Sequence, residues 1–350
     1  MSILIDTPAV RYLALLLVAA LTTRVLMPLA HIMGRRMNAW DAPDDLSHSG
    51  HVFRLARTGG IAIVGGIYVG NMVAVMLQPE LFATRDMAAM MLGGAAVFVV
   101  GLLDDLREIA PWLKAVLLVA ASVATVMMMT AVALTGYERL DFLLAALALM
   151  GGANAFNLMD GLDGLAAGMA VAACLGLLAL SLRLQTFEGG SVKLICIGAA
   201  LGFLYYNRPP AGIFMGDCGS LPLGFYLAVM GLNTVRSGPA SFVPVLLVLS
   251  PFALDTGLAV VRRLLLRRDV FSGDRRHIYD LLHERITSVW RVDWIMWSLG
   301  LAFSGLGLAA TWLAVPWQLA LLAFSWTAAV LWMAALGMFA PEARTPGSAS

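Results

Sequence analysis

Long apolar runs separated by short polar stretches dominate the pattern along the chain. A helix needs about 20 mostly apolar residues to cross the hydrocarbon layer of a bilayer. Because lipid offers no hydrogen-bond partners to the backbone, such runs predict α-helices. The predicted spans are residues 9–30, 59–77, 87–103, 113–134, 142–157, 164–182, 191–206, 219–235, 241–262, 295–314 and 317–338. The predicted fold class is therefore all-α, a polytopic membrane protein with about eleven transmembrane helices.

Composition agrees with this class. Of 350 residues, 60% are hydrophobic and only 13% are charged, whereas charged residues make up about 25% of a soluble domain. The net charge of +1 offers no basic surface, so no nucleic-acid partner is expected. The sequence shows no internal repeat. We expect a single integral-membrane domain over residues 1–340 and a polar cytoplasmic tail over residues 341–350.

Basic residues are distributed unevenly between the loops on the two sides. One set of loops holds 17 of the 23 lysines and arginines, and the other set holds six. The positive-inside rule makes the richer set cytoplasmic. The N-terminus is then expected outside and the C-terminus in the cytoplasm. Most acidic residues fall on the same cytoplasmic side, and only Asp255 lies within a predicted span.

Two adjacent aspartates, Asp104 and Asp105, follow the third span in the motif "GLLDDL". Neighbouring carboxylates repel each other, which raises their pKa values unless a cation lies between them. The pair indicates a divalent-cation site or a general base. A solvated helix end is the alternative.

The stretch "NAFNLMDGLDGLAAG", residues 154–168, places four polar residues between apolar runs. Asp160 and Asp163 are three residues apart, as is Asn157 from Asp160, which is the spacing of one helix face. The intervening glycines allow a ligand to approach the backbone. A helix cap needs only one such residue, and Asn154 brings the number to four. The stretch therefore favours a binding site over a cap.

The motif "IFMGDCGSLPLGF" sets Asp217 between glycines just before a span. A carboxylate is a hard oxygen ligand suited to magnesium. Gly219 and Ser220 are expected to open the helix, where free N–H groups suit an anion. Phe214 is either a lipid anchor or a stacking platform.

The largest predicted cytoplasmic loop contains the motif "DRRHIYDLL". Arg275 and His277 in this motif suit phosphate oxygens, since arginine binds them through its bidentate fork. Basic residues beside a membrane also simply fix topology and attract anionic lipid. Carboxylates and basic groups on one face suit phosphoryl transfer between a nucleotide donor and a lipid acceptor.

Four motifs occur along the chain in the order "RTGGIAIVGG", "GLLDDL", "NAFNLMDGLDGLAAG" and "FMGDCGSLPLG". Together they resemble the motifs of the polyprenyl-phosphate N-acetylhexosamine-1-phosphate transferases, glycosyltransferase family 4. The resemblance covers residues 41–282 and includes the relatives of phospho-MurNAc-pentapeptide translocase. It implies transfer of an N-acetylhexosamine-1-phosphate from a UDP-sugar to polyprenyl (undecaprenyl) phosphate, with release of UMP. This reaction would start synthesis of a surface polysaccharide, O-antigen or related glycan.

The resemblance also implies a cofactor, a location and residue roles. The cofactor is Mg²⁺, with Mn²⁺ as an alternative, and the active site faces the cytoplasm from the bacterial inner membrane. A homodimer is left open. The implied catalytic residues are Asp104, Asp105, Asp160 and Asp163. The implied metal ligands are Asp217 and Asp105. The implied substrate-binding residues are Arg57, Asn154, Asn157, Phe214, Gly219, Ser220, Arg275 and His277, with Phe214 matching an aromatic that stacks on uracil.

Two motifs depart from the family pattern. The last motif often reads H-x-H-H, but here only His277 is a histidine, with Tyr279 and Asp280 in the other places. The first loop has Leu46 where the polysaccharide branch commonly has arginine. We expect these changes to affect the choice of sugar more than the reaction.

Two other functions remain open on the sequence. A CDP-alcohol phosphotransferase also pairs aspartate with glycine, but its D-x-x-D-G-x-x-A-R pattern lacks the final arginine here. A membrane transporter would need ionisable residues along a path, and Asp255 is the only acidic residue within a predicted span.

Overall fold

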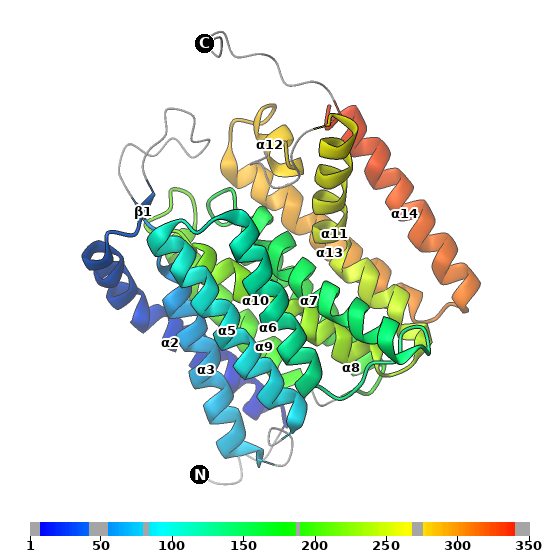
Figure 1. Cartoon of the computed structure of the whole chain (residues 1–350), viewed down its shortest axis with the longest axis horizontal. Helices are drawn as coiled ribbons and strands as arrows, with labels where there is room; N and C mark the ends of the chain where they lie inside the picture. Colours follow the sequence, from blue (N-terminus) through cyan, green and yellow to red (C-terminus); the bar gives the residue numbers. More distant parts are fainter. Residues whose placement is uncertain (1–7, 42–54, 80–83, 187–189, 268–275, 340–350) are drawn as a thin grey trace.

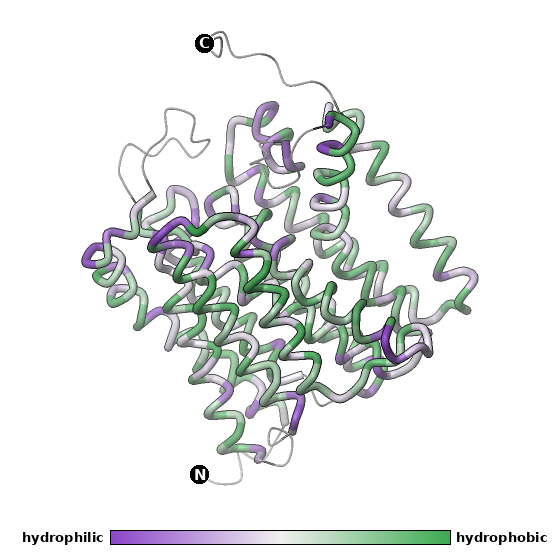
Figure 2. The backbone as a smooth tube through the Cα atoms, viewed as in Figure 1, coloured by the Kyte–Doolittle hydropathy of each residue, from purple (hydrophilic) through white to green (hydrophobic). Residues whose placement is uncertain are grey.

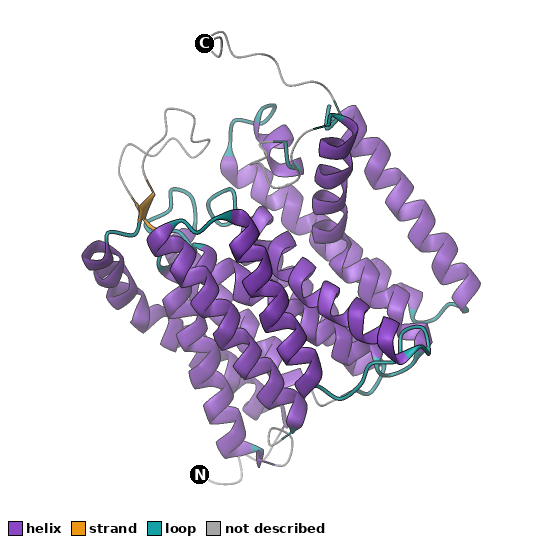
Figure 3. Cartoon of the chain, viewed as in Figure 1, coloured by secondary structure: helices purple, strands orange, loops and turns teal. Residues whose placement is uncertain are grey.

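The computed structural model describes residues 8–41, 55–79, 84–186, 190–267 and 276–339. Almost all regular structure in these ranges is helical (Figure 3). The long helices are α2 (Pro8–Met37), α3 (Gly59–Leu77), α5 (Arg85–Arg107), α6 (Pro111–Met128), α7 (Glu138–Met159), α8 (Leu165–Arg183), α9 (Gly190–Asn207), α10 (Asp217–Val235), α11 (Phe242–Leu265), α13 (Val289–Ala310) and α14 (Val315–Ala335). The short elements are α12 (Ile278–His283), the 3-10 helix η2 (Pro239–Ser241) and the antiparallel strands β1 (Trp40–Asp41) and β2 (Leu55–Ala56).

Ten helices of the described chain are long and apolar enough to cross a membrane, namely all the long helices except α9. Helix α9 is mostly buried against α2 and α8 and contains Lys193, so it has less need of an apolar surface. Each of the eleven predicted spans corresponds to one long helix. The predicted class, an all-α polytopic membrane protein, is confirmed, and hydrophobic residues run along the helices while hydrophilic ones gather near their ends (Figure 2).

Motif residues from distant parts of the sequence meet at one end of the bundle, which we call the motif end. Lys114, near the start of α6, pairs with Asp104 near the end of α5 and with Asp217 at the start of α10. The N–H of Gly59, which opens α3, donates to the carbonyl oxygen of Phe214 at 2.9 Å. Strand β1 and helix α12 also lie at this end, the upper one in Figure 1.

Helix α10 is the centre of the bundle, and almost all of its residues are buried against α5, α7, α3 and α8. Glycines allow this close packing. A Cβ on Gly60 would lie 2.1 Å from the Gly219 nitrogen, and a Cβ on Gly224 would lie 2.4 Å from the Gly152 carbonyl oxygen. Small residues let the backbones of membrane helices approach. Because α10 cannot shift without breaking these contacts, Asp217 is held firmly at its first position.

Three helix boundaries differ clearly from the predicted spans: α2 continues past residue 30 to Met37, α13 begins at Val289 rather than at residue 295, and α6 ends early. Helix α6 ends at Met128, although the apolar run continues to residue 134. The N–H of Thr130 donates to Asp86 Oδ1 at 2.6 Å, and Arg236 donates to the Thr130 carbonyl oxygen at 2.5 Å. These polar contacts hold the end of the run as a loop, so apolar composition alone overestimated the helix.

Candidate active site

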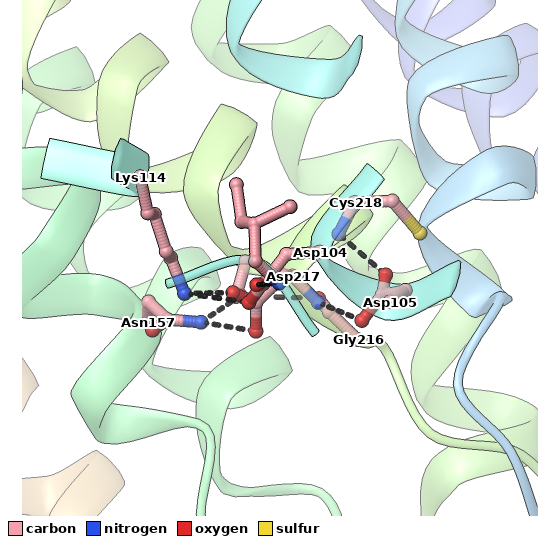
Figure 4. A network of polar contacts seen from close by, with 9 residues as sticks. Asp104, Asp105, Lys114, Asn157, Gly216, Asp217 and Cys218 are labelled. Carbon is pink, nitrogen blue, oxygen red and sulfur yellow. Dashed lines mark hydrogen bonds and ion pairs between the residues drawn. The ribbon is translucent and has the colours of Figure 1, made fainter. Parts of the chain in front are cut away.

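A polar cluster at the motif end joins α5, α6, α7 and α10 (Figure 4). The Lys114 ammonium lies 3.0 Å from Asp104 Oδ2 and also pairs with Asp217 Oδ2. Asn157 Nδ2 donates to Asp217 Oδ1 at 2.8 Å and to Ser220 Oγ at 2.9 Å. Two carboxylates thus converge on one cation, and Asn157 fixes the orientation of the Asp217 side chain.

The residue before Asp217 must be glycine. Gly216 has φ of 68°, and a Cβ there would lie 2.0 Å from the Arg57 carbonyl oxygen and 2.7 Å from Asp105 Oδ2. A positive φ favours glycine, and the neighbouring atoms leave no space for a side chain. The glycine therefore allows the loop before α3 to lie against the start of α10.

Asp105 has a different task from its neighbour Asp104. Its Oδ1 accepts the N–H of Asp217 at 2.9 Å, and its Oδ2 accepts the N–H of Cys218 at 2.8 Å. A carboxylate at a helix N-terminus satisfies free N–H groups and interacts favourably with the helix dipole. The Asp105 carboxylate thus faces the start of α10 and caps that helix. Its role as a metal ligand stays a prediction, since a carboxylate has about four lone-pair sites.

The first turn of α10 also differs from the prediction. The N–H groups of Gly219 and Ser220 donate to the Gly216 carbonyl oxygen at 3.1 and 3.0 Å, and Asp105 accepts those of the two preceding residues. The expectation of free N–H groups for a substrate anion is therefore wrong. Gly219 instead provides close packing against Gly60, and Ser220 supports Asn157.

The "DGLDG" segment is a loop, so the prediction that Asp160 and Asp163 share a helix face is wrong. Helix α7 ends at Met159 and α8 begins at Leu165, with Gly164 in the left-handed region at φ of 80°. Glycine in that conformation interrupts a helix. Asp163 is buried, and its Oδ2 accepts the N–H of Ala211 at 2.9 Å. Asp163 thereby ties the α7–α8 loop to the loop before α10.

Asp160 caps the C-terminus of α7 and is partly exposed. Loss of hydration raises its pKa, the negative charges of Asp217 and Asp105 raise it further, and Arg57 opposes them. The resulting pKa of Asp160 is about 7. The carboxyl group is therefore poised to change its charge near neutral pH when a cation or an anion arrives.

Three predicted substrate-binding residues surround this loop. Phe214 is half-buried, and its N–H donates to the Ala56 carbonyl oxygen at 2.9 Å. Arg57 is half-buried, its N–H donates to the Ala39 carbonyl oxygen at 3.1 Å, and its charge reaches Asp160. Asn154 is half-buried and lies one turn before Asn157 on α7. The structure thus brings the loop before α3, which contains Arg57, close to the "NAFNLMDGLDGLAAG" motif.

The last motif forms the short helix α12. His277 is its N-cap, and the His277 N–H donates to Asp280 Oδ2 at 3.0 Å. The His277 ring is buried, with Nδ1 2.6 Å from Asp255 Oδ2. The N–H of Ile278 donates to Asp255 Oδ1 at 2.9 Å. Asp255 therefore holds the last motif in place through His277 and the start of α12.

Tyr279 connects this motif to the α7–α8 loop. Its ring stacks on His277 with centroids 5.6 Å apart, and its hydroxyl donates to the Leu158 carbonyl oxygen at 3.1 Å. A Cβ on Gly161 would lie 2.2 Å from the Tyr279 hydroxyl oxygen. Glycine at position 161 thus makes room for Tyr279 rather than for a ligand. Arg275 and Leu46 lie outside the described residues, as does the predicted tail over residues 341–350.

Two residues of the site were not predicted as functional. Lys114 is one of only two lysines in the chain and follows the acid pair closely, which is a signal that the sequence offered. Asp293 on α13 is fully buried behind the α7–α8 loop. Its setting in "WRVDW" resembles the ordinary polar start of a helix, so no sequence signal set it apart.

The carboxylates can be tested for their fit to magnesium. Among the residues that the structure describes, no group of three or more His, Cys, Asp or Glu side chains could hold a metal ion. Magnesium, however, is often bound by one or two carboxylates together with substrate phosphates and water. Asp104 and Asp217 already share the cationic Lys114. This pair fits a magnesium ion that binds jointly with a phosphate substrate.

Membrane-spanning helices and a carboxylate-rich polar site at one end of the bundle define the class of a multi-pass membrane enzyme. The family model "Glycosyl transferase family 4" matches residues 87–235. The chain is 30% identical over 298 residues to a probable undecaprenyl-phosphate N-acetylglucosaminyl 1-phosphate transferase of Bacillus subtilis, covering 80% of this chain and 79% of that protein. The chain therefore belongs to glycosyl transferase family 4.

Two further relatives show which parts are shared. A decaprenyl-phosphate N-acetylglucosaminephosphotransferase of Mycobacterium tuberculosis is 34% identical over 277 residues, covering 68% of this chain and 67% of that protein. A phospho-N-acetylmuramoyl-pentapeptide-transferase of Chlamydia muridarum is 52% identical over 92 residues, covering 25% of this chain and 28% of that protein. The similarity is thus extensive with the first kind of relative and confined to a short segment with the second.

Proposed function

We propose that this protein transfers an N-acetylhexosamine-1-phosphate from a UDP-sugar to polyprenyl phosphate and releases UMP. The observation that carries the proposal is the convergence of Asp104, Asp217 and Lys114 at one end of a membrane-spanning bundle. Two relatives that each match two thirds or more of their own length are named for transfer of an N-acetylglucosamine phosphate to a polyprenyl phosphate. A lipid acceptor and a soluble donor can meet only at such an interface.

The chemistry is displacement at the phosphorus that carries the sugar. An oxygen of the acceptor phosphate attacks this phosphorus, its bond to the UMP oxygen breaks, and UMP leaves with the electron pair. The second pKa of a phosphomonoester is about 6, so the acceptor is mostly dianionic at neutral pH. A strong general base is therefore unnecessary, and Asp104 paired with Lys114 is more useful for arranging charge.

Charge neutralisation is the main need of such a displacement. Asp217 and Asp104 would hold a magnesium ion, which supplies positive charge against the diphosphate. Asn157 orients Asp217, and Asp105 fixes the first turn of α10 that carries it. Lys114 holds a permanent positive charge beside both carboxylates. These residues prepare the site before the substrate arrives.

The nucleoside would bind beside the α7–α8 loop. Asn154, Asn157 and Asp160 approach this place from α7, while Arg57 and Phe214 approach it from the loops before α3 and α10. Phe214 offers an aromatic face for a base, and Arg57 offers a charge for a phosphate. We assign uridine on the resemblance of the motifs.

We further propose that the motif end faces the cytoplasm. Lys114 and Arg57 lie at this end, as do Arg107, Arg208 and Arg262 at the ends of their helices. The opposite end holds Arg85, Arg139, Arg183, Lys193 and Arg236. The positive-inside rule then places UDP-sugar binding in the cytoplasm, with an inner-membrane location as the corresponding expectation.

The test is release of UMP from UDP-N-acetylglucosamine by the purified protein, with and without polyprenyl phosphate. The proposal expects release only when acceptor and magnesium are both present, and loss of release in Asp217→Asn. Glu138→Gln, an exposed change at the opposite end, is the matched control and should keep full activity. Acceptor-independent release, or near-normal turnover in Asp217→Asn, would refute the proposal. Release of CMP from a CDP-alcohol instead would support the other phosphotransferase class.

A further inference from the structure

Helix α13 carries a buried carboxyl group that the proposed reaction does not use. Asp293 has an exposed fraction of 0%, and among the described residues neither of its carboxyl oxygens has a hydrogen-bond partner. An ionised carboxylate without a partner is very costly to bury, so such a group neutralises by taking up a proton. Asp293 is therefore held as a neutral carboxylic acid.

This acid lies directly behind the "DGLDG" loop. A Cβ on Gly164 would lie only 3.0 Å from Asp293 Oδ2. Gly164 closes the loop in a left-handed conformation, and its N–H donates to Asn207 Oδ1 at 2.8 Å. Asp163 is the residue immediately before Gly164. Asp293 is thus close to both residues that end the loop.

The position of Asp293 is fixed from both sides on one face of α13. Trp290 Nε1 donates to the Pro209 carbonyl oxygen at 3.2 Å, and Trp297 Nε1 donates to the Leu165 carbonyl oxygen at 3.2 Å. Residues three and four apart share a helix face, so Asp293 lies between these two tryptophans. The two hydrogen bonds connect α13 to the loop before α10 and to the start of α8.

Other charged groups around α13 are occupied elsewhere. Helix α8 has no ionisable residue in its first two turns. On α11 and α12, Asp255 is bonded to His277, and Asp280 accepts the His277 N–H. Arg291 on α13 itself is exposed. Asp163 adjoins Gly164, the residue that Asp293 approaches.

We propose that Asp293 is a positioning residue, a neutral acid whose added proton forms the missing hydrogen bond to Asp163 and so sets the "DGLDG" loop for the nucleotide. A buried polar group without a partner destabilises the folded state relative to an apolar group of similar shape. A protonated carboxyl group can donate one hydrogen bond, and a neighbouring ionised carboxylate can accept it. This pairing explains why an acidic side chain lies at position 293. That the loop binds a nucleotide rests on the function proposed above, whereas the protonation of Asp293 does not depend on that function.

The first experiment needs no activity. A folded state that holds Asp293 protonated binds one more proton than the unfolded state above about pH 4, so stability falls as pH rises. We expect the melting temperature of detergent-solubilised wild type to fall more steeply between pH 5 and pH 8.5 than that of Asp293→Asn. Glu138→Gln should keep the wild-type slope. An unchanged slope in Asp293→Asn would overturn the proposal, whether or not the protein proves to be the transferase.

The second experiment separates positioning from packing. Asn at position 293 still donates a hydrogen bond, and Leu does not. We expect Asp293→Asn to keep the KM for UDP-N-acetylglucosamine within about threefold of wild type. Asp293→Leu should raise this KM at least tenfold, while the KM for polyprenyl phosphate stays within twofold and the melting temperature at pH 8 does not fall. Equal donor KM values in wild type and Asp293→Leu, or equal losses in both variants, would overturn the proposal.

Discussion

Removal of the Lys114 charge is the most direct perturbation of the polar cluster. The ammonium lies 3.0 Å from Asp104 Oδ2, and its side chain is only 18% exposed. At an effective dielectric constant of 20, unit charges at that distance attract by about 5 kcal/mol. Loss of hydration offsets much of this, and removing one partner of a buried pair typically costs about 3–5 kcal/mol. In Lys114→Met, Asp104 and Asp217 would face each other without a cation.

We therefore expect Lys114→Met to unfold at a clearly lower temperature than wild type in EDTA. Magnesium should restore much of this loss, because the ion replaces the missing charge, and wild type should respond less. UMP release should fall by at least about 100-fold, the usual effect of removing one group that stabilises developing charge. The assay pair is thermal unfolding in detergent, with and without magnesium, and UMP release at saturating substrates.

The chain offers a matched control in its only other lysine. Lys193 is buried near the start of α9, at the end of the bundle away from the cluster. Lys193→Met also removes a buried ammonium, but it should leave the magnesium response and the turnover unchanged. If Lys114→Met unfolds like wild type in EDTA and keeps near-normal turnover, the charge argument for the cluster is incorrect.

Three further predictions concern the substrate pocket. Phe214→Ala should weaken UMP inhibition by about 1–3 kcal/mol, by analogy with base–aromatic stacking, and unchanged inhibition would argue against the pocket. The pKa of Asp160 is raised from 3.8 to about 7, so its contribution to stability is present below about pH 4 and is lost as pH rises towards 7. In metal-free protein, Asp160→Asn should flatten this fall, by at most about 1.4 kcal/mol per pH unit, and a wild-type slope in the variant would contradict the raised pKa. Tyr279→His with Asp280→His should change the ranking of UDP-N-acetylhexosamines while activity on at least one donor remains, although the capping bond to His277 is lost.

The sequence predicted the class of fold well because membrane spans depend mainly on composition. An apolar run long enough to cross lipid has few alternatives to a helix, and every predicted span became one. The boundaries were less certain for a physical reason. The end of α6 depends on Asp86 and Arg236, which approach from other helices, and no local pattern contains that contact.

The sequence predicted which motifs form the candidate site, but not what each residue of those motifs contacts there. Asp217, Asn157, Asp160 and Phe214 do lie at the motif end, as their motifs suggested. The predicted helix face shared by Asp160 and Asp163 failed because Gly164 adopts a positive φ. A spacing of three residues indicates a shared face only where the backbone is helical, and glycines beside aspartates were the available sign that it is not.

Asp104 and Asp105 show most clearly why residue tasks need the tertiary structure. Consecutive residues on a helix point about 100° apart, so the adjacent carboxylates at the end of α5 face different groups of the site. One turns towards Lys114, and the other turns towards the N–H groups of Asp217 and Cys218 (Figure 4). Which residue receives which task depends on how α5 is rotated against α10. That rotation is set by glycine contacts such as Gly101 against the Asp217 backbone. The same acid pair therefore supplies one group beside Lys114 and one group that holds the start of α10, and with it Asp217, in place.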